Sequence, residues 1–428
     1  MPLGFHPDLG RLPGDAVGGS AAAGRPDEPL HYGLGPKAVR VSLFTHDLIV
    51  VGAGPAGTAA AIAATRHGSK RVIIVDKAPP GRDKVCGDAI GPEGAAELVG
   101  LGLPGLLRAQ ERARSFRLTS PAGVSASGSP PVAGYVVARV EFDARLLQAA
   151  IAVGVEFEQL RVRSLHHEGG GTRVGEKLTA PVVIGADGAN SVVRRAVGQP
   201  ANTGKHLAVA VRGYAPTPAG TDELFIGWDS QPGGGLCYVW AFPLASGVTN
   251  IGYGCASTAA GGGRARLVRR LAELLPDFDV AGTELAGHRL PLSTWRPVPA
   301  VGNVLLTGDA ASLINPTTGE GISYALASGA LAGRAAATCT DTAGAVYMAE
   351  LKARFGGHHK RMARIYPLLD IPIAVEAAVR ACARDRVVFE RILELGLGAG
   401  RLRRRHLLRF AAAAVLPQRV SAPRAEHD

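Results

Sequence analysis

Three glycines near the start of the sequence have the spacing of a nucleotide-binding turn. Gly52, Gly54 and Gly57 follow the apolar run 48–51, which has the composition of a strand buried on both faces of a parallel sheet. The small residues after Pro55 predict a helix whose first-turn amides and positive dipole end face the glycines. A ligand that carries a pyrophosphate fits such a turn.

An acidic residue extends this pattern. The run 71–75 predicts a second strand, and Asp76 follows it about 20 residues after the glycines, where a carboxylate accepts hydrogen bonds from a ribose diol. Lys77 comes directly after it. A glycine turn without a ligand is the alternative, but the flanking strands, helix and acid favour a dinucleotide. This segment alone does not choose among NAD, NADP and FAD.

Two later turns repeat the strand-to-helix pattern. The strand predicted over 181–186 leads into ADGANSVVRRAVG, which contains Asp187. The strand predicted over 304–307 precedes Asp309, and a long helix of small residues is predicted from about Ile322. The unpaired amides at the start of that helix would stabilise a reduced flavin, which carries negative charge at its pyrimidine edge.

Composition limits the class of protein. The 428 residues are enough for two or three domains, and the 46% hydrophobic content suits an ordinary α/β globular protein. The five cysteines are scattered, without CxxC spacing, so we expect a reducing cytoplasm and no metal site. The sequence has no uninterrupted apolar run of about 18 residues and no secretion signal.

Positive charge is concentrated near the C-terminus. Nine arginines and three acidic residues lie in 380–409, so this segment holds more than half of the net charge of +11. The segment GRLRRRHLLRFAAAAVL couples arginines to apolar residues, which is typical of a peripheral helix on the inner face of a membrane. A helix packed on the core is the open alternative. Base-stacking aromatics are few, so no nucleic-acid partner is expected.

The order of the three turns resembles that of FAD enzymes of the aromatic-hydroxylase type. Because no second G-x-G-x-x-G follows a strand, we expect one FAD per chain and no separate Rossmann domain for a nicotinamide donor. Within that superfamily, the loop KVCGDAI and the hairpin YVWAFP resemble the geranylgeranyl reductase family, which uses reduced FAD to saturate isoprenoid double bonds. The resemblance covers 47 to about 334. Gly235 stands where the family has proline, and the nearest proline is Pro232.

The resemblance implies an α/β fold in which an antiparallel β-sheet substrate domain interrupts a Rossmann-like FAD-binding domain, followed by a helical C-terminal region. The predicted segments are a disordered leader, 1–45; the FAD-binding domain, 46–114, 139–205 and 300–340; the substrate domain, 115–138 and 206–299; C-terminal helices, 341–416; and a disordered tail, 417–428. Helices are predicted over 345–368 and 372–395, and a hairpin turn over 245–247.

The resemblance also assigns site residues. The adenosine half of FAD is expected at Gly52, Gly54, Gly57 and Asp76, and the pyrophosphate is expected near Arg139. The ribityl and phosphate side is expected at Asp309. The isoalloxazine is expected beside Gly319, Glu320, Gly321 and Ile322. Lys77 and Asp187 complete the predicted cofactor set, and Cys86, Gly87 and Asp88 are expected on the reactive side of the flavin. Tyr238, Trp240 and Phe242 are expected to wall the prenyl chain, with plain sheet core as the alternative.

An isolated alkene has no carbonyl to polarise, so a hydride from flavin must be matched by a proton in a dry cavity. Cys86 is the best candidate donor, with a packing role as the alternative, while Asp88 would need a pKa raised by burial to stay protonated. A quinone, a glycerolipid, a diphosphate and a specialised metabolite are all possible carriers of the prenyl chain. NAD(P)H and ferredoxin are both candidate electron donors, and the oligomeric state is not predicted.

Other functions on the same scaffold stay open. A flavin monooxygenase would insert oxygen into a specialised metabolite, and a halogenase would need a lysine beyond the flavin, for which Lys84 is the lysine in the likely loop. A flavin-binding scaffold or lipid carrier is the nonenzymatic alternative. The loop KVCGDAI favours saturation over these functions.

Overall fold

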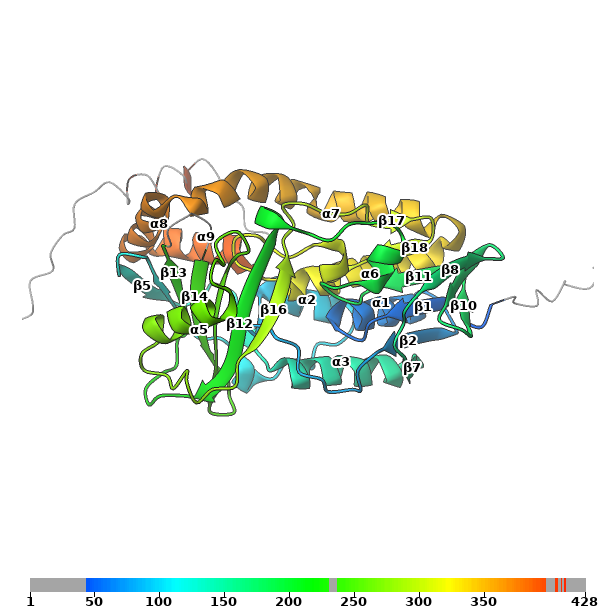
Figure 1. Ribbon diagram of the computed structural model, residues 1–428, viewed down its shortest axis with the longest axis horizontal. Coiled ribbons are helices and arrows are strands. Elements are labelled where there is room, and N and C mark those ends of the chain that lie inside the picture. The colour runs from blue at the N-terminus through cyan, green and yellow to red at the C-terminus, as the bar shows by residue number, and fades with distance from the viewer. Residues whose placement is uncertain (1–43, 231–236, 398–404, 407–408, 410–411, 413–428) are drawn as a thin grey trace, which may run out of the picture. The chain divides into compact units, whose positions relative to one another are not determined.

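A computed structural model of the chain describes residues 44–230, 237–397, 405, 406, 409 and 412, all of which lie in one compact unit (Figure 1). The predicted leader falls outside the described residues except for Phe44 and Thr45, and the predicted tail falls outside them entirely. Most of the basic C-terminal segment, and the departure from the family pattern at Gly235 and Pro232, also lie outside them.

A six-stranded sheet carries the nucleotide turns. Five of its strands are parallel, and the edge strand β17 is antiparallel. Its order is β17 (Ala300–Val301), β18 (Val304–Leu306), β11 (Val182–Gly185), β1 (Leu48–Val51), β2 (Val72–Asp76) and β7 (Glu156–Gln159). The four central strands are buried along their whole length, because helices cover both faces, and this explains their continuous apolar runs.

Two helices of small residues pack on this sheet in direct backbone contact. They are α1 (Pro55–Arg66) and α6 (Ile322–Thr338). A Cβ atom on Gly329 would lie 2.1 Å from the carbonyl oxygen of Ala56, and one on Gly333 would lie 2.0 Å from that of Ala60. The glycines, one helical turn apart, therefore allow an approach that any side chain would prevent.

Further helices enclose the same core. On α3 (Arg139–Ala152), Phe142, Leu146 and Ala150 recur at helical spacing and are buried on one face. In Figure 1, α3 lies along the lower edge and α7 (Ala343–Ile365) along the upper edge. The shorter helices α2 (Pro92–Gly100) and α4 (Val192–Ala196) also belong to this part of the chain.

A seven-stranded sheet forms the second part of the fold. Its order is β16 (Ala286–Pro291), β12 (Leu207–Pro216), β15 (Val248–Ala256), β14 (Cys237–Pro243), β13 (Leu224–Asp229), β4 (Phe116–Thr119) and β5 (Ser125–Gly128). The predicted antiparallel arrangement holds except between β13 and β4, which are parallel. The predicted hairpin is formed by β14 and β15, with the intervening turn closed by the Gly247 amide donating to the Leu244 carbonyl at 3.2 Å.

The two faces of this sheet are covered by different helices. Side chains of α5 (Gly263–Leu274) pack with Val239 of β14, whereas α8 (Pro372–Arg384) and α9 (Arg386–Leu397) pack with Trp240 and Phe242. Successive residues of a strand point to opposite faces of the sheet, so the side chains of β14 divide into one set on each face. The aromatic residues of β14 therefore face the C-terminal helices.

One predicted helix is interrupted in the structure. The segment expected to be one helix over 372–395 is divided at Asp385 into α8 and α9. Asp385 has extended backbone, and its Oδ1 accepts hydrogen bonds from the amides of Val387 and Val388 at 2.8 and 3.2 Å. A side-chain cap of this kind begins a new helix, which the apolar periodicity alone did not indicate.

Two small sheets complete the described elements. One pairs β3 (Ala89–Ile90) with β6 (Tyr135–Val136), and the other contains β8 (Leu165–Glu168), β9 (Gly171–Val174) and β10 (Leu178–Ala180). The sequence provided no prediction for the second of these. In the described ranges, no helix combines the length and the apolar character that a membrane crossing requires.

The helix contact predicts a large loss of stability for Gly333→Val. Both Val methyl groups and the Cβ would overlap the α1 backbone, so we expect the free energy of unfolding to fall by about 3 kcal/mol in chemical denaturation. Thr338→Val, a change at an exposed position of the same helix, is the control and should change it by less than about 1 kcal/mol. Equal effects of the two substitutions would contradict direct backbone contact.

Candidate active site

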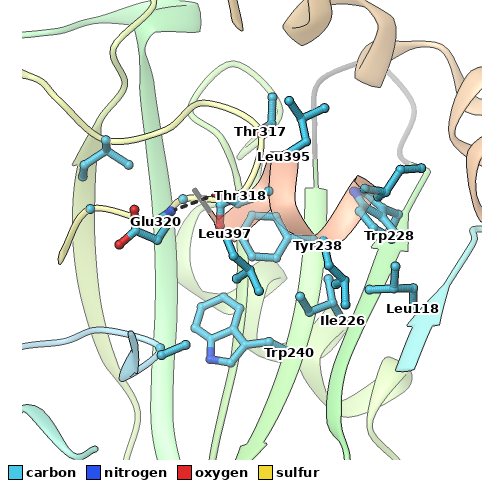
Figure 2. A pocket seen from close by; sticks show the side chains of 18 of the residues that line it. Leu118, Ile226, Trp228, Tyr238, Trp240, Thr317, Thr318, Glu320, Leu395 and Leu397 are labelled. Atoms are coloured by element: carbon cyan, nitrogen blue, oxygen red, sulfur yellow. Dashed lines mark hydrogen bonds between the residues drawn. The ribbon is translucent and has the colours of Figure 1, made fainter. Parts of the chain in front are cut away.

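A cavity of about 520 Å³ lies where the two large sheets meet the C-terminal helices. Polar side chains line one end, among them Lys84, Asp309 and Glu320. The remainder is mainly apolar, and Figure 2 shows Trp240, Tyr238 and Leu397 facing one another across it. The cavity joins the predicted flavin end of the fold to the aromatic face of the seven-stranded sheet.

The first glycine turn requires glycine for steric reasons. Gly52 has a φ of +112°, and a Cβ there would lie 2.3 Å from the Ala186 carbonyl oxygen. A Cβ on Gly57 would lie 1.8 Å from the Gly52 carbonyl oxygen. Gly54 is the N-cap of α1 and supplies no side-chain cap, so amides of the first turn are available to a ligand.

Two guanidinium groups converge on this turn. A Cβ on Gly54 would lie 3.8 Å from Nη2 of Arg82 and 3.9 Å from Nη2 of Arg139. The carboxylate of Asp76 accepts hydrogen bonds from the amides of Ala53 and Ala78 at 2.8 and 2.9 Å, and its Oδ2 lies 3.9 Å from Nε of Arg82. Two cations beside a helix N-terminus suit a pyrophosphate, and the sequence analysis did not assign Arg82.

Arg139 has a partner that the sequence analysis missed. The resemblance drawn from the sequence places it near the pyrophosphate, and it is only 2% exposed. Its Nε and Nη2 donate to the two carboxylate oxygens of Asp143 at 2.7 and 2.6 Å. Burial alone would lower the pKa of Arg139, yet the Asp143 carboxylate raises it above its ordinary value. The i,i+4 spacing of the pair was the available signal.

The second turn is held by Asp187. Its Oδ2 accepts hydrogen bonds from the amides of Val192 and Val193 at 2.6 and 3.1 Å, so the carboxylate caps α4. The buried Oδ1 has no hydrogen-bond partner among the described residues, and burial raises the pKa of Asp187. Lys77, in contrast, is an exposed residue after β2 and does not line the cavity.

The third turn places an ion pair at the polar end of the cavity. Asp309 follows β18, and its Oδ2 lies 2.8 Å from Nζ of Lys84. Burial would raise the pKa of Asp309, but the ammonium group of Lys84 outweighs burial and holds that pKa below its usual value. Asp309 and Lys84 both line the cavity, as the assignment of Asp309 to the cofactor requires.

The loop before α6 meets the substrate sheet. The hydroxyl of Tyr238 donates to the Thr318 carbonyl at 3.1 Å, and a Cβ on Gly319 would lie 2.2 Å from that hydroxyl oxygen. Gly319 has a φ of +70°, so glycine is required there on two grounds. Gly321 is the N-cap of α6 and brings no capping side chain of its own, and the carboxyl group of Glu320 accepts from the Ser323 amide of the first turn.

Glu320 is the least satisfied acidic group at this end. Its Oε1 accepts a hydrogen bond from the Ser323 amide at 2.8 Å, while the buried Oε2 has no partner among the described residues. Burial raises the pKa of Glu320 to about 7. A carboxyl group that is about half protonated at neutral pH can, in its protonated form, donate a hydrogen bond to a ligand in the cavity.

The loop with Cys86 is fixed by side chains of the other sheet. Asn250 Nδ2 donates to the Cys86 carbonyl at 2.8 Å and to Asp88 Oδ2 at 2.7 Å, and Arg212 Nε donates to the same carbonyl at 3.0 Å. The hydroxyl of Tyr214 donates to Asp88 Oδ2 at 2.6 Å. Asp88 has a φ of +64°, a strained conformation that this network maintains.

Burial controls protonation in this loop. Burial raises the pKa of the Cys86 thiol, and the positive charge of Arg139 offsets part of the rise, so the thiol is protonated at neutral pH. Burial also raises the pKa of Asp88 to about 6, although Tyr214 and Asn250 donate to it. The structure therefore makes Cys86 a neutral acid that faces the cavity.

The aromatic residues of β14 are both core and cavity wall. Tyr238, Trp240 and Phe242 line the cavity, and their ring atoms also pack with α8 and α9. Gly252 lies under the indole, since a Cβ there would lie 2.1 Å from Trp240 Cζ2, and Trp240 Nε1 donates to Asn250 Oδ1 at 2.9 Å. Phe242 reaches the loop that contains Cys86, 3.3 Å from the Cβ position of Gly87. The two interpretations drawn from the sequence are thus compatible.

Several site residues were not predicted. They are Arg212 and Tyr214 of β12, Asn250 of β15, and His288 of β16. The Nε2 atom of His288, which lines the cavity, is buried without a partner among the described residues, and burial lowers the pKa of His288 to about 4. Polar residues that interrupt apolar strands were the available signal.

The three turns together fit FAD. The glycine cradle and two guanidinium groups suit the pyrophosphate, and Asp309, Glu320 and the start of α6 follow along the cavity. Within the part of the chain that the structure describes, no three His, Cys, Asp or Glu side chains are placed to share a metal ion.

Comparison with known proteins agrees with this site. A family model described as FAD binding domain matches residues 45–241. Menaquinone reductase of Mycobacterium tuberculosis is 34% identical over 307 residues, which cover 67% of this chain and 75% of that protein. Digeranylgeranylglycerophospholipid reductase of Methanocella arvoryzae is 30% identical over 316 residues, which cover 69% of this chain and 78% of that protein.

The chain belongs to the geranylgeranyl reductase family of FAD-dependent oxidoreductases. The fold of this family member is also similar to that of a geranylgeranyl bacteriochlorophyll reductase-like protein from Thermoplasma acidophilum. The TM-score is 0.71 at 20% identity, and the match covers 86% of this chain and 96% of the other. The geranylgeranyl reductase resemblance drawn from the sequence, the fold class and the FAD cofactor are confirmed.

The raised pKa of Asp88 predicts a pH-dependent effect of Asp88→Asn. The folded protein holds this proton up to about pH 6, so wild-type stability falls as pH rises from about 4 through 6, whereas the amide does not titrate. The stability of the variant relative to wild type should increase over that window by about 2–3 kcal/mol and then stay constant. Denaturation of the holoprotein at several pH values measures this. A difference that does not change with pH would contradict the raised pKa.

Proposed function

We propose that this family member saturates carbon–carbon double bonds of a prenyl chain carried by a quinone or lipid. The observation that carries the proposal is one continuous cavity, which is mainly apolar and has the Cys86 thiol in its wall. Relatives named menaquinone reductase and digeranylgeranylglycerophospholipid reductase support a substrate of this class.

The lining of the cavity matches a long hydrocarbon chain. Leu118, Ile226 and Trp228 come from the seven-stranded sheet (Figure 2). Val379 and Leu393 come from the C-terminal helices. A prenyl chain gains free energy by leaving water for such a surface, and the cavity in return excludes water from the reaction. The polar end leaves room for the chemistry near Cys86 and Asp88.

Cys86 is the proposed proton donor. FAD, when bound and reduced, supplies a hydride to one alkene carbon, and Cys86 Sγ gives its proton to the neighbouring carbon. The thiol suits this role because its pKa is raised by burial, so it enters the reaction protonated. Arg139 lies near the sulfur and stabilises the thiolate that forms. Asn250 and Arg212 position the loop and do not touch the reacting atoms.

The alternative on the same scaffold is oxygen or halogen insertion into a specialised metabolite. A halogenase lysine must be available to its reagent, whereas Nζ of Lys84 is bound to Asp309 at 2.8 Å. The ion pair fixes the ammonium group at the polar end of the cavity. We therefore favour saturation over this alternative.

Product mass decides between the functions. We expect the holoprotein, reduced anaerobically with dithionite, to add two hydrogens per double bond to a menaquinone or a geranylgeranyl lipid in detergent. Mass spectrometry of the extracted lipid measures the change. A gain of oxygen or halogen under air would instead indicate the alternative, and an unchanged lipid would indicate a carrier. Reduction of the flavin by NAD(P)H or by ferredoxin would identify the donor.

Cys86→Ala should lower turnover on the prenyl substrate by at least about 100-fold while FAD stays bound, because the proton donor is lost. Cys86→Ser keeps the size of the side chain but has a much weaker acid, so it should be nearly as slow. Cys339→Ala, outside the cavity, is the control. Near-normal turnover by the serine variant would mean that Cys86 is only a packing residue.

A further inference from the structure

Exposed aliphatic side chains cluster at the turn between α7 and α8. Leu368 is 51% exposed, Ile371 44% and Ile373 77%. In the rest of the described chain, no other six consecutive residues contain three large hydrophobic side chains that are this exposed. Pro367 and Pro372 in the same turn are also exposed. A contiguous apolar surface of this kind marks a contact with an apolar partner.

The same turn forms part of the cavity wall. Ile365, Leu368 and Ala374 line the cavity, and Leu368 is at the same time half exposed to solvent. Leu368 thus belongs to both the cavity wall and the outer surface. Buried Tyr366 fixes the turn by packing against Leu292 and Ile314. The exposed patch therefore borders the cavity wall.

Positive charge lies on the helix that leads into this turn. Lys360 and Arg364 are exposed in the last turns of α7. Asp370 is the acidic residue within the turn itself. An apolar patch with basic neighbours matches a bilayer that contains anionic lipid, whose surface attracts Lys and Arg.

We propose that residues 368–373 dock on an anionic lipid bilayer and that the prenyl chain enters the cavity beside Leu368. The second half of this proposal rests on the proposed function, since prenyl lipids reside in bilayers. The docking surface differs from the sequence expectation, which placed the membrane contact in the basic segment that lies mostly outside the described residues.

Two substitutions remove the patch without harming the helix. Ile371 is the N-cap of α8 and Ile373 lies in its first turn, where aspartate is favourable through capping and the helix dipole. Neither residue lines the cavity. The double variant Ile371→Asp/Ile373→Asp should therefore fold and bind FAD, which the flavin spectrum checks.

Val140→Asp is the matched control. Val140 is 41% exposed and has the same place in the first turn of α3 that Ile373 has in α8. Figure 1 shows α3 along the edge opposite α7. The Val140→Asp substitution introduces a negative charge at an equivalent helix position. It therefore separates the general effect of an added charge on vesicle binding from the effect of changing the 368–373 surface.

Sedimentation with phosphatidylcholine vesicles that contain phosphatidylglycerol tests the surface. We expect the wild-type holoprotein to bind, less so without phosphatidylglycerol or at high salt. The double variant should bind at least about tenfold more weakly, because two exposed isoleucines that would enter the bilayer become charged groups, and Val140→Asp should bind as wild type. Absence of wild-type binding, or unchanged binding by the double variant, would overturn the proposal.

Two further measurements separate related outcomes. If light scattering shows a dimer that the double variant breaks while vesicle binding is unchanged, the patch joins two copies of the chain and the proposal is wrong. Turnover of a prenyl substrate dispersed in detergent should be the same for wild type and double variant. If wild type fails to reduce that substrate while vesicle binding follows the prediction, the proposed function fails and the docking surface stands.

Discussion

Direct contact between the backbones of α1 and α6 is the constraint on which the site depends. Gly329 and Gly333 allow it, because each would place a Cβ about 2 Å from an α1 carbonyl oxygen. Gly329 lies against Ala56 and Gly333 against Ala60, so the two helices run in parallel and their N-termini, at Gly54 and Gly321, point the same way. Two helix N-termini can then serve one extended, negatively charged ligand.

The reacting loop is positioned from the second sheet. Cys86 follows a strand of the parallel sheet, but the groups that hold its carbonyl, Asn250 and Arg212, come from strands about 130–160 residues later in the chain. Asn250 also accepts from Trp240, which lines the substrate cavity. One hydrogen-bond network therefore couples the wall of the substrate site to the proposed proton donor, and displacement of the indole would disturb both.

The C-terminal helices supply much of the apolar lining of the cavity. Residues of α8 and α9 cover the aromatic face of the sheet and line the same cavity as Cys86 and Asp88, whose pKa values burial raises. The turn with Leu368 leads directly into α8, so the proposed entrance lies next to these helices. Packing in this part of the chain therefore bears on both protonation in the site and access to it.

Local signals in the sequence were sufficient for much of this protein. The glycines at 52, 54 and 57, Asp76, and the later turns at Asp187 and Asp309 identified an FAD protein of α/β fold, because glycine spacing and buried apolar strands report on nearby backbone geometry. The loop with Cys86 and the hairpin with Tyr238 and Trp240 indicated the family.

Only the tertiary structure supplied the partners of those residues. The sequence analysis did not predict that Arg139 pairs with Asp143 or that Asp309 pairs with Lys84. It also did not predict that Asn250 and Tyr214 donate hydrogen bonds to Asp88, or that α8 and α9 line the cavity. The exposed turn that contains Ile373 likewise has no distinctive pattern in the amino-acid sequence. Local sequence determines which backbone a segment adopts, but charge balance, burial and openings depend on segments that meet only when the chain folds.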